Sequence, residues 1–453
     1  MAARPDSAYA PILRDLAAAR SVMLRFLYTL TMYLLTPVIL YRLAARGLKH
    51  RDYFARWRER FAYFPDPGIR RSIWVHAVSM GEVNAAAPLV EALMRTYPSS
   101  PFVVTTVTPT GSERVRKLFG DRVFHVYLPY DLPTSVRRFF DRVDPYLAVV
   151  LETEIWPNLF IACRERGIPI VVANARLSER SLRGYGPVRA LARRAIRCAS
   201  YVAAQSPVDA ERLRTLGAAV SRLSVVGNLK FDMEVPASLA GIGVRLRETW
   251  GTGRPVWIAA STHEGEEMPV LKAHTAVLQR FPDALLVIVP RHPERFRPVA
   301  AACRSLGFAT RTRSEDETAD ERSQCFVVDT IGELLHYYAA SDIAFVGGSL
   351  EPIGGHNLLE AAALGLPVLV GPHTFNTEEV TDSLLAANAA LRIADADALG
   401  ATVIRLLAHE GERAAMGEAA REVLLRERGA VERTLRIVAR VLENQPVTGN
   451  GGH

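Results

Sequence analysis

The feature that most constrains the fold is an alternation of strand and helix patterns that starts afresh once along the chain. After residue 70, short apolar runs typical of buried strands alternate with longer helical stretches. Such alternation predicts parallel sheets covered by helices on both faces. The expected strands are 72–78, 102–107, 123–128, 147–151, 170–173, 201–204 and 223–226, and then 256–260, 284–289, 325–328, 343–346 and 367–370.

The two series of strands predict two domains. The chain has 453 residues, more than a single hydrophobic core usually organises. Residues 236–253 open on a proline and contain four glycines, so we interpret them as a linker. We expect an N-terminal extension with an apolar segment in 1–45, one domain in 46–240, and a second domain with terminal helices in 241–453. Ligands of such sheets bind at the carboxyl ends of the strands, so a cleft between the domains is the expected site.

An apolar run near the N-terminus is the candidate membrane segment. Residues 26–41 contain no formal charge, but these 16 residues include Pro37 and are fewer than the roughly 20 that a perpendicular span needs. Arginines flank the run, and no small-residue cleavage site of a secretory signal follows it. We interpret it as an uncleaved anchor or an interfacial helix, with a buried amphipathic helix as the alternative.

The charge is divided unevenly along the chain. Residues 1–250 contain 36 Lys and Arg against 21 Asp and Glu, a balance of +15, whereas residues 251–453 contain 19 against 27, a balance of −8. A basic first half indicates an anionic partner, which could be nucleic acid, a membrane surface or a phosphorylated substrate. The four cysteines form no C-x-x-C pair, which argues against a structural zinc site and a disulfide framework.

A glycine-rich stretch in the second half is the strongest candidate for a ligand site. The chain lacks the dinucleotide and P-loop fingerprints, and the His263 motif lacks the second histidine of H-E-x-x-H. Residues 347–360 read GGSLEPIGGHNLLE, which predicts a glycine loop followed by a helix. A helix beginning near Asn357 would direct its dipole at a phosphate, and Glu360 could accept hydrogen bonds from ribose hydroxyls. The alternative is that Asn357 caps the helix and Glu360 completes a capping box.

A series of sequence blocks through nearly the whole chain resembles one enzyme family. The blocks include VHAVSMGE, LETEIWPNL, VVGNLKFD, VPRHPERF, DTIGELL and GGHNLLEAAALGLPVLVGP. Their order resembles that of the 3-deoxy-D-manno-octulosonic acid (Kdo) transferases of Gram-negative bacteria, which transfer Kdo from CMP-Kdo to the lipid A precursor (lipid IVA) in lipopolysaccharide core biosynthesis. The resemblance implies an α/β, GT-B glycosyltransferase fold: two Rossmann-like, doubly wound parallel-sheet domains facing a central cleft, with an N-terminal membrane-associated helix.

The resemblance assigns three catalytic residues. The H-x-x-S-x-G-E block makes Glu82 the general base of an inverting single displacement, which takes the proton of the attacking hydroxyl. Glu82 also follows Ser79 by three residues, so a capping box is the competing interpretation. The E-T-E-[IL]-W-P-N block implicates Glu152 in transition-state stabilisation, with a surface carboxylate as the alternative. The G-x-L-K-F-D block implicates Lys230 in the same role, with an ion pair to Asp232 as the alternative.

The same resemblance implies a set of donor contacts in the second half. Leu358 stands where related sequences often have proline, which is optional in a first helical turn. We expect no metal and no cofactor, because CMP-Kdo is a co-substrate and helix amides, Arg291 and Lys230 could neutralise the leaving group. The implied donor contacts are Arg291, His292, Ile331, Gly332, Glu333, Asn357, Leu358, Leu359 and Glu360.

The expected partners are CMP-Kdo, the lipid A precursor and anionic lipid of the inner membrane, with no nucleic acid. The expected location is the cytoplasmic face of the bacterial inner membrane. Two other functions stay open: a GT-B transferase that uses another nucleotide sugar on a membrane lipid, and a non-catalytic, membrane-bound saccharide-binding protein.

Overall fold

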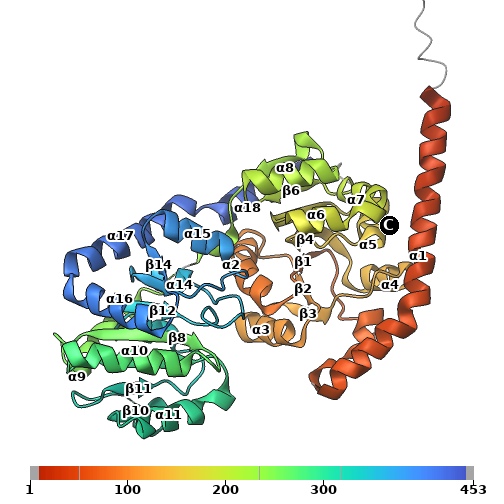
Figure 1. The fold of residues 1–453 in the computed structure, drawn as a ribbon. Coiled ribbons are helices and arrows are strands. Elements are labelled where there is room, and N and C mark those ends of the chain that lie inside the picture. Colours follow the sequence, from red (N-terminus) through yellow and green to blue (C-terminus); the bar gives the residue numbers. More distant parts are fainter. Residues whose placement is uncertain (1–9, 50, 234, 317, 445–453) are drawn as a thin grey trace, which may run out of the picture. The chain divides into compact units, whose positions relative to one another are not determined.

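The computed structural model describes residues 10–49, 51–233, 235–316 and 318–444, and it contains two compact units (Figure 1). The first unit is formed by the chain up to Asp232 together with the segment from Arg428 onward, and the second by Met233–Glu427. Each unit is built around a seven-stranded sheet in which all neighbouring strands pair in parallel. The predicted doubly wound architecture is therefore confirmed in both halves.

The sheet of the first unit has the strand order β3-β2-β1-β4-β5-β6-β7. The chain moves outward from β1 to β3 and then returns to the other side of β1 with β4. The direction of winding thus reverses between β1 and β4, which is where open parallel sheets usually bind ligands. The strands are β1 (Ser72–His76), β2 (Phe102–Thr106), β3 (Phe124–Tyr127), β4 (Pro145–Leu151), β5 (Ile170–Ala175), β6 (Tyr201–Ala204) and β7 (Leu223–Val225).

Helices cover both faces of the first sheet. On one face Trp74 of β1 packs edge-on against Phe139, with ring centroids 5.2 Å apart. The helices of that face are α4 (Pro133–Val143), α5 (Pro157–Glu165), α7 (Arg189–Ile196) and α8 (Pro207–Leu216), and those of the other are α2 (Met80–Thr96), α3 (Pro109–Phe119) and α18 (Ala430–Glu443).

Helix α18 differs from the predicted domain boundary. We expected 241–453 to form one domain, but α18 buries Ile437 and Val438 in the core of the first unit. The backbone N–H groups of Gly429 and Val431 donate to the carboxylate of Asp232 at 2.5 Å, which secures the start of α18. The last helix therefore completes the first unit, because an apolar stripe on it covers that sheet.

The sheet of the second unit has the strand order β10-β11-β9-β8-β12-β13-β14, with its reversal between β8 and β12. The edge strands β10 and β14 were not predicted, because three residues are too few to show a periodicity. The strands are β8 (Val256–Thr262), β9 (Leu285–Pro290), β10 (Thr310–Thr312), β11 (Cys325–Val327), β12 (Ile343–Val346), β13 (Val368–Val370) and β14 (Ala390–Arg392). The helices are α9 (Ser238–Trp250), α10 (Glu267–Arg280), α11 (Phe296–Ser305), α12 (Arg313–Asp316), α13 (Leu334–Tyr338), α14 (Leu359–Ala363), α15 (Glu378–Ala386), α16 (Ala396–Ala408) and α17 (Glu410–Glu427).

The predicted linker 236–253 is wrong, because most of it forms the helix α9. Trp250 of α9 is fully buried, and its ring stacks on Tyr337 of α13 with centroids 6.4 Å apart. Gly243 permits this packing, since a Cβ at that position would lie 2.4 Å from the carbonyl oxygen of Ala339. The glycines that suggested a flexible segment thus include one that brings two helices close together.

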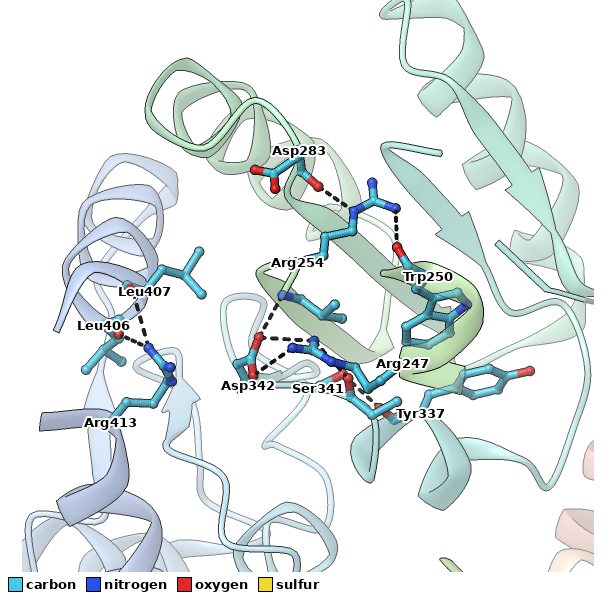
Figure 2. A network of polar contacts seen from close by, with 12 residues as sticks. Arg247, Trp250, Arg254, Asp283, Tyr337, Ser341, Asp342, Leu406, Leu407 and Arg413 are labelled. Atoms are coloured by element: carbon cyan, nitrogen blue, oxygen red, sulfur yellow. Dashed lines mark hydrogen bonds and ion pairs between the residues drawn. The ribbon is translucent and has the colours of Figure 1, made fainter. Parts of the chain in front are cut away.

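Polar contacts secure α9 and β8 at the amino ends of the central strands (Figure 2). Arg247 forms an ion pair with Asp342 at 3.2 Å, and the same carboxylate accepts the N–H of Val256 at 2.8 Å. Arg254 donates to the carbonyl oxygens of Asp283 and Trp250. This network lies at the edge of the sheet opposite the carboxyl ends of the strands, so it stabilises the unit away from the ligand-binding edge.

The N-terminal helix α1 (Ala10–Lys49) lies beside the first unit (Figure 1). Residues Met23–Leu48 are long and apolar enough to cross a membrane. The helix nevertheless docks through polar side chains: Tyr28 donates to Asp131 at 3.0 Å, and Arg25 and Thr29 both donate to Asn158. The remaining helix of the first unit, α6, comprises Glu179–Gly184.

Candidate active site

The first-unit site lies at the carboxyl ends of β1 and β4, where the winding of the sheet reverses. Glu82 follows β1 in the first turn of α2, and Glu152 follows β4 directly. Because β1 and β4 are paired neighbours, the two predicted catalytic carboxylates come to the same edge of the sheet although 70 residues separate them.

Glu82 closes the capping box that the sequence allowed. Its backbone N–H donates to the hydroxyl of Ser79 at 3.4 Å, and its carboxylate accepts the N–H of Val78 at 2.8 Å. Burial, the largest cause, and the charges of Glu152 and Glu154 together raise the pKa of Glu82 to about 7. A carboxyl with a pKa near neutrality can accept a proton at physiological pH, so capping and proton transfer are compatible in one side chain.

Glu152 occupies a strained backbone conformation at the end of β4. Its φ of +57° lies in the left-handed region, which non-glycine residues rarely adopt. Two residues later, Glu154 accepts a hydrogen bond from the indole of Trp156 at 2.9 Å, and burial raises the pKa of this carboxyl. The loop after β4 therefore presents a cluster of carboxylates beside Glu82, rather than the isolated surface carboxylate of the alternative interpretation.

Lys230 lies in a short helical turn, Leu229–Asp232, that packs against α2. The side chains of two asparagines accept hydrogen bonds from the backbone of this turn. Asn174 accepts the N–H of Leu229 at 2.9 Å, and Asn228 accepts the N–H of Lys230 at 3.1 Å. Asp232, the alternative ion-pair partner, instead binds the start of α18. The turn therefore places Lys230 in the same unit as Glu82 and against α2, the helix that carries Glu82. Sequence reasoning did not identify Asn174, whose only signal was its position at the end of a predicted strand.

The second-unit site is organised by Glu266, which the sequence analysis also missed. This carboxylate is completely buried and accepts four backbone N–H groups, from His263, Gly348, Ser349 and Leu350, at 2.7–2.9 Å. It therefore ties the loop after β8 to the glycine loop after β12, the two strands that flank the reversal. Its signal in the sequence is the HEGEE block directly after the first strand of the second half, which lacks the second histidine of a zinc motif.

A histidine cluster lies above these two loops. The Nε2 atoms of His263 and His356 are 2.7 Å apart, and the ring of His292 meets that of His263 edge-on with centroids 5.0 Å apart. Burial, the largest cause, and the neighbouring His263, Arg291 and His292 together lower the pKa of His356 to about 4. The cluster thus places three imidazoles beside the guanidinium of Arg291. Within the described residues, no group of three or more His, Cys, Asp and Glu side chains could hold a metal ion.

Two of the predicted donor contacts join this cluster directly. Arg291 and His292 follow β9, and the N–H of Arg291 donates to the carbonyl of Thr262 at 2.9 Å, which holds their loop against the end of β8. Because β9, β8 and β12 are adjacent, the three loops that follow these strands converge.

The predicted group 331–333 lies one strand further out, after β11. Ile331 is exposed, and Gly332 has a φ of +101° that suits glycine. Glu333 pairs with Arg313 at 3.0 Å, and this ion pair lowers the pKa of the Glu333 carboxyl. The loop therefore carries an anchored turn with an exposed apolar side chain at its tip.

The group 357–360 combines a hydrogen-bonding asparagine ahead of α14 with two buried leucines. Asn357 accepts the N–H of Leu359 at 3.1 Å and donates to Glu360 at 3.0 Å, but the N-cap residue of α14 is Leu358, so the two side chains do not form the predicted capping box. Leu358 and Leu359 are buried, so their side chains pack in the core of the unit. The helix begins at Leu359 rather than near Asn357, and α14 has only five residues.

The expected phosphate cradle at the glycine loop is partly filled by the protein itself. The N–H groups of Gly354 and Gly355 both donate to the carbonyl of Gly348, at 2.9 and 2.6 Å. Three further amides of the loop are taken by Glu266. At this edge Arg291 therefore supplies positive charge and the imidazoles supply N–H donors, which the short helix does not.

Comparisons with known proteins agree with this architecture. Residues 55–233 match the family described as 3-Deoxy-D-manno-octulosonic-acid transferase (kdotransferase), and residues 270–423 match Glycosyl transferases group 1. A 3-deoxy-D-manno-octulosonic acid transferase from Haemophilus influenzae is 43% identical over 93% of this chain and 99% of its own length. The Bordetella pertussis protein of the same name is 39% identical over 91% of this chain and 98% of its own.

Solved structures share the fold at low sequence identity. A UDP-GlcNAc 2-epimerase from Neisseria meningitidis has a TM-score of 0.55 and 15% identity, covering 82% of this chain and 100% of that one. A glycosyltransferase from Rickettsia africae has a TM-score of 0.53 and 14% identity, covering 83% and 99%.

The two parallel sheets and the glycosyltransferase match in the second unit define a glycosyltransferase of the GT-B fold. The identity shared with curated relatives over nearly the full length then narrows the class. The chain belongs to the 3-deoxy-D-manno-octulosonic acid transferase family.

Proposed function

We propose that this protein transfers Kdo from CMP-Kdo to the lipid A precursor lipid IVA by a single inverting displacement. The observation that carries the proposal is Glu82, a half-buried carboxyl whose pKa is raised to about 7 at the winding reversal of the first sheet. Membership of the family supports the choice of donor and acceptor.

At the anomeric carbon of Kdo, one bond forms and one breaks. The acceptor hydroxyl oxygen attacks the anomeric carbon of Kdo, and its proton passes to the Glu82 carboxylate. The bond between that carbon and the phosphate oxygen breaks, and CMP leaves with the electron pair. Lys230 and Arg291 are assigned to neutralising the charge that accumulates on CMP, and Glu152 to stabilising the transition state.

The second unit is assigned to donor binding. The cationic loop after β9 and the group 357–360 after β12 suit a nucleotide that carries a phosphate. Glu333 and Ile331 extend this edge toward β11. The proposal thus assigns proton removal to the first unit and donor binding to the second, in keeping with the division into two compact units.

Attachment to anionic lipid on the cytoplasmic face of the inner membrane completes the proposal. Helix α1 exposes a row of large apolar side chains, including Phe26, Leu34 and Tyr41 at 64%, 70% and 73% exposure. The basic balance of residues 1–250 adds attraction to anionic lipid. A lipid acceptor lies in the same membrane, so the attached protein would bind it there.

The test is Glu82→Gln in the full chain, assayed with CMP-Kdo and the lipid A precursor in detergent. Glutamine keeps an oxygen for the Val78 N–H but cannot act as the base, so kcat should fall by about 10²- to 10⁴-fold while CMP-Kdo affinity is kept. Ser79→Ala is the matched control: it removes the cap at a cost of about 1 kcal/mol of stability, and it also removes the hydroxyl that donates to the Glu82 carboxylate at 3.2 Å, which raises the pKa of Glu82. It leaves the base itself in place, so most turnover should be retained above that pKa. Near-normal kcat in Glu82→Gln would leave Glu82 as a cap only. Transfer from UDP-sugars in place of CMP-Kdo would overturn the choice of donor.

A further inference from the structure

The paired imidazoles of His263 and His356 have no role in the mechanism above. They come from loops that are 93 residues apart, after β8 and after β12, and their rings are nearly parallel, with an interplanar angle of 6° and centroids 5.0 Å apart. An Nε2–Nε2 separation of 2.7 Å requires one nitrogen to donate its proton to the other. The pair therefore shares a single proton while the bond is intact.

The groups that face this pair are a third imidazole, that of His292, and the guanidinium of Arg291. His292 and Arg291 approach from the loop after β9, and both lower the pKa of His356. The backbone of Gly348 lies against the His356 ring, since a Cβ on Gly348 would be 2.9 Å from its Cδ2 atom. No contribution from a carboxylate raises the pKa of His356.

The carboxylates of the region are placed away from His356. Glu266 lies beneath the two loops, with both oxygens occupied by backbone amides, although its charge partly offsets the lowering of the His263 pKa. Glu264 and Glu267 both pair with Arg295, at 3.3 and 3.2 Å. Glu351 lies against Gly265, where a Cβ would be 2.6 Å from its Oε1 atom. The site thus combines three imidazoles and a guanidinium, a set that favours an oxyanion.

We propose that His263 and His356 bind an oxyanion of the nucleotide sugar, and that the pair opens when the donor enters. The inference rests on the proposed function, in which this unit holds CMP-Kdo. The Nε2–H that one histidine already carries donates to an oxygen of the anion. The other Nε2, released from its acceptor role, takes up one proton from water and donates to a second oxygen. Binding of one donor therefore consumes about one proton.

Glu266 is the positioning residue of the His263–His356 pair. It fixes the backbone of His263 and of Gly348 with the same carboxylate oxygen, at 2.9 and 2.7 Å, and so sets the distance between the two loops that carry the imidazoles. The donor's oxyanion has two chemical sources, the phosphate of CMP and the carboxylate of the acid sugar. Both would accept two N–H bonds from the opened pair.

The test is isothermal titration of the full-length protein in detergent with CMP and, separately, with CMP-Kdo. Titrations in buffers of different ionisation enthalpy at pH 7 report the protons taken up. The variants are His263→Asn and His356→Asn, with His409→Asn, an exposed histidine at the end of α16, as the matched control. Thermal unfolding confirms that each variant is folded, and two separate positions keep the test valid if one variant fails to fold.

We expect uptake of about one proton in the wild type and in His409→Asn, and its loss in either site variant, with binding weakened about 10- to 100-fold. Weakening of both CMP and CMP-Kdo identifies the phosphate as the anion, and weakening of CMP-Kdo alone identifies the sugar carboxylate. Unchanged affinity and unchanged proton uptake in both site variants overturn the inference. A wild type that does not bind CMP-Kdo would instead overturn the proposed function, so the two failures are distinguishable.

Discussion

At the scale of single residues, the pKa of Glu82 depends on its neighbours, so substituting a neighbour should change that pKa. Burial is the main cause of its raised pKa of about 7, and the charge of Glu152 is the next. A base must be ionised, so kcat/KM should rise with pH through a limb near 7. Glu152→Gln removes a negative charge, which lowers the pKa of Glu82 and moves this limb to lower pH, even where kcat itself falls.

The matched variant for this prediction is Glu154→Gln. Glu154 raises the pKa of Glu82 less than Glu152 does. In Glu154→Gln the limb of the pH profile should therefore also move to lower pH, but by a smaller amount. The measurement is the pH profile of kcat/KM for the three proteins between pH 5 and 9. A limb that stays in place in Glu152→Gln would mean that another group controls the rate.

Single residues also show what the sequence could predict. The blocks around Glu82, Glu152 and Lys230 identified candidate side chains, because the resemblance rests on local strings of residues. Glu266 and the pair His263 and His356 were not predicted. Their contacts join loops that are more than 80 residues apart, and this adjacency follows from the strand order β9-β8-β12, which a single sequence does not specify.

At the scale of elements, α9 offers a pair of glycines with opposite expected effects. Gly243→Ala places a Cβ 2.4 Å from the carbonyl oxygen of Ala339 and should lower stability by about 1–3 kcal/mol. Gly241→Ala meets only the flexible end of Arg245, at 3.6 Å, so the better helix propensity of alanine should raise stability by about 0.5–1 kcal/mol. Thermal and denaturant unfolding of the full chain would measure both. Equal effects of the two substitutions would contradict the close packing of α9 against α13.

The same element explains why part of the fold was misread. The four glycines and leading proline of residues 236–253 are typical of a linker, but Leu239, Gly243 and Trp250 of α9 form a buried stripe that only a helical reading reveals. The central strands were predicted well because they are fully buried and therefore continuously apolar. The start of α14 was placed too early, since the side chain of Asn357 accepts its hydrogen bond ahead of the helix.

At the scale of the whole molecule, the uneven charge and the apolar helix suggest two components of membrane attachment. The docked side of α1 bears Arg25, Tyr28 and Thr29, and these polar contacts to Asn158 and the buried Asp131 hold the helix along the first unit. Its other side exposes apolar side chains. A helix held in this way suits attachment in the plane of the lipid headgroups, with its exposed side toward the acyl chains. Deleting 1–45 would remove both sides at once and leave Asp131 without its Tyr28 partner.

A sharper test changes only the exposed side of the helix. Leu34→Gln and Tyr41→Gln together remove two of its most exposed apolar groups and leave Arg25, Tyr28 and Thr29 in place. The wild type should sediment with anionic vesicles at both low and high salt, because apolar insertion does not depend on ionic strength. The double variant should still sediment at low salt, through the basic first half, but should be released at about 0.5 M salt, where charges are screened within a few ångströms. Neutral vesicles are the control, and the double variant should not bind them at any salt concentration. Salt-resistant binding of the double variant to anionic vesicles would show that attachment does not depend on this side of α1.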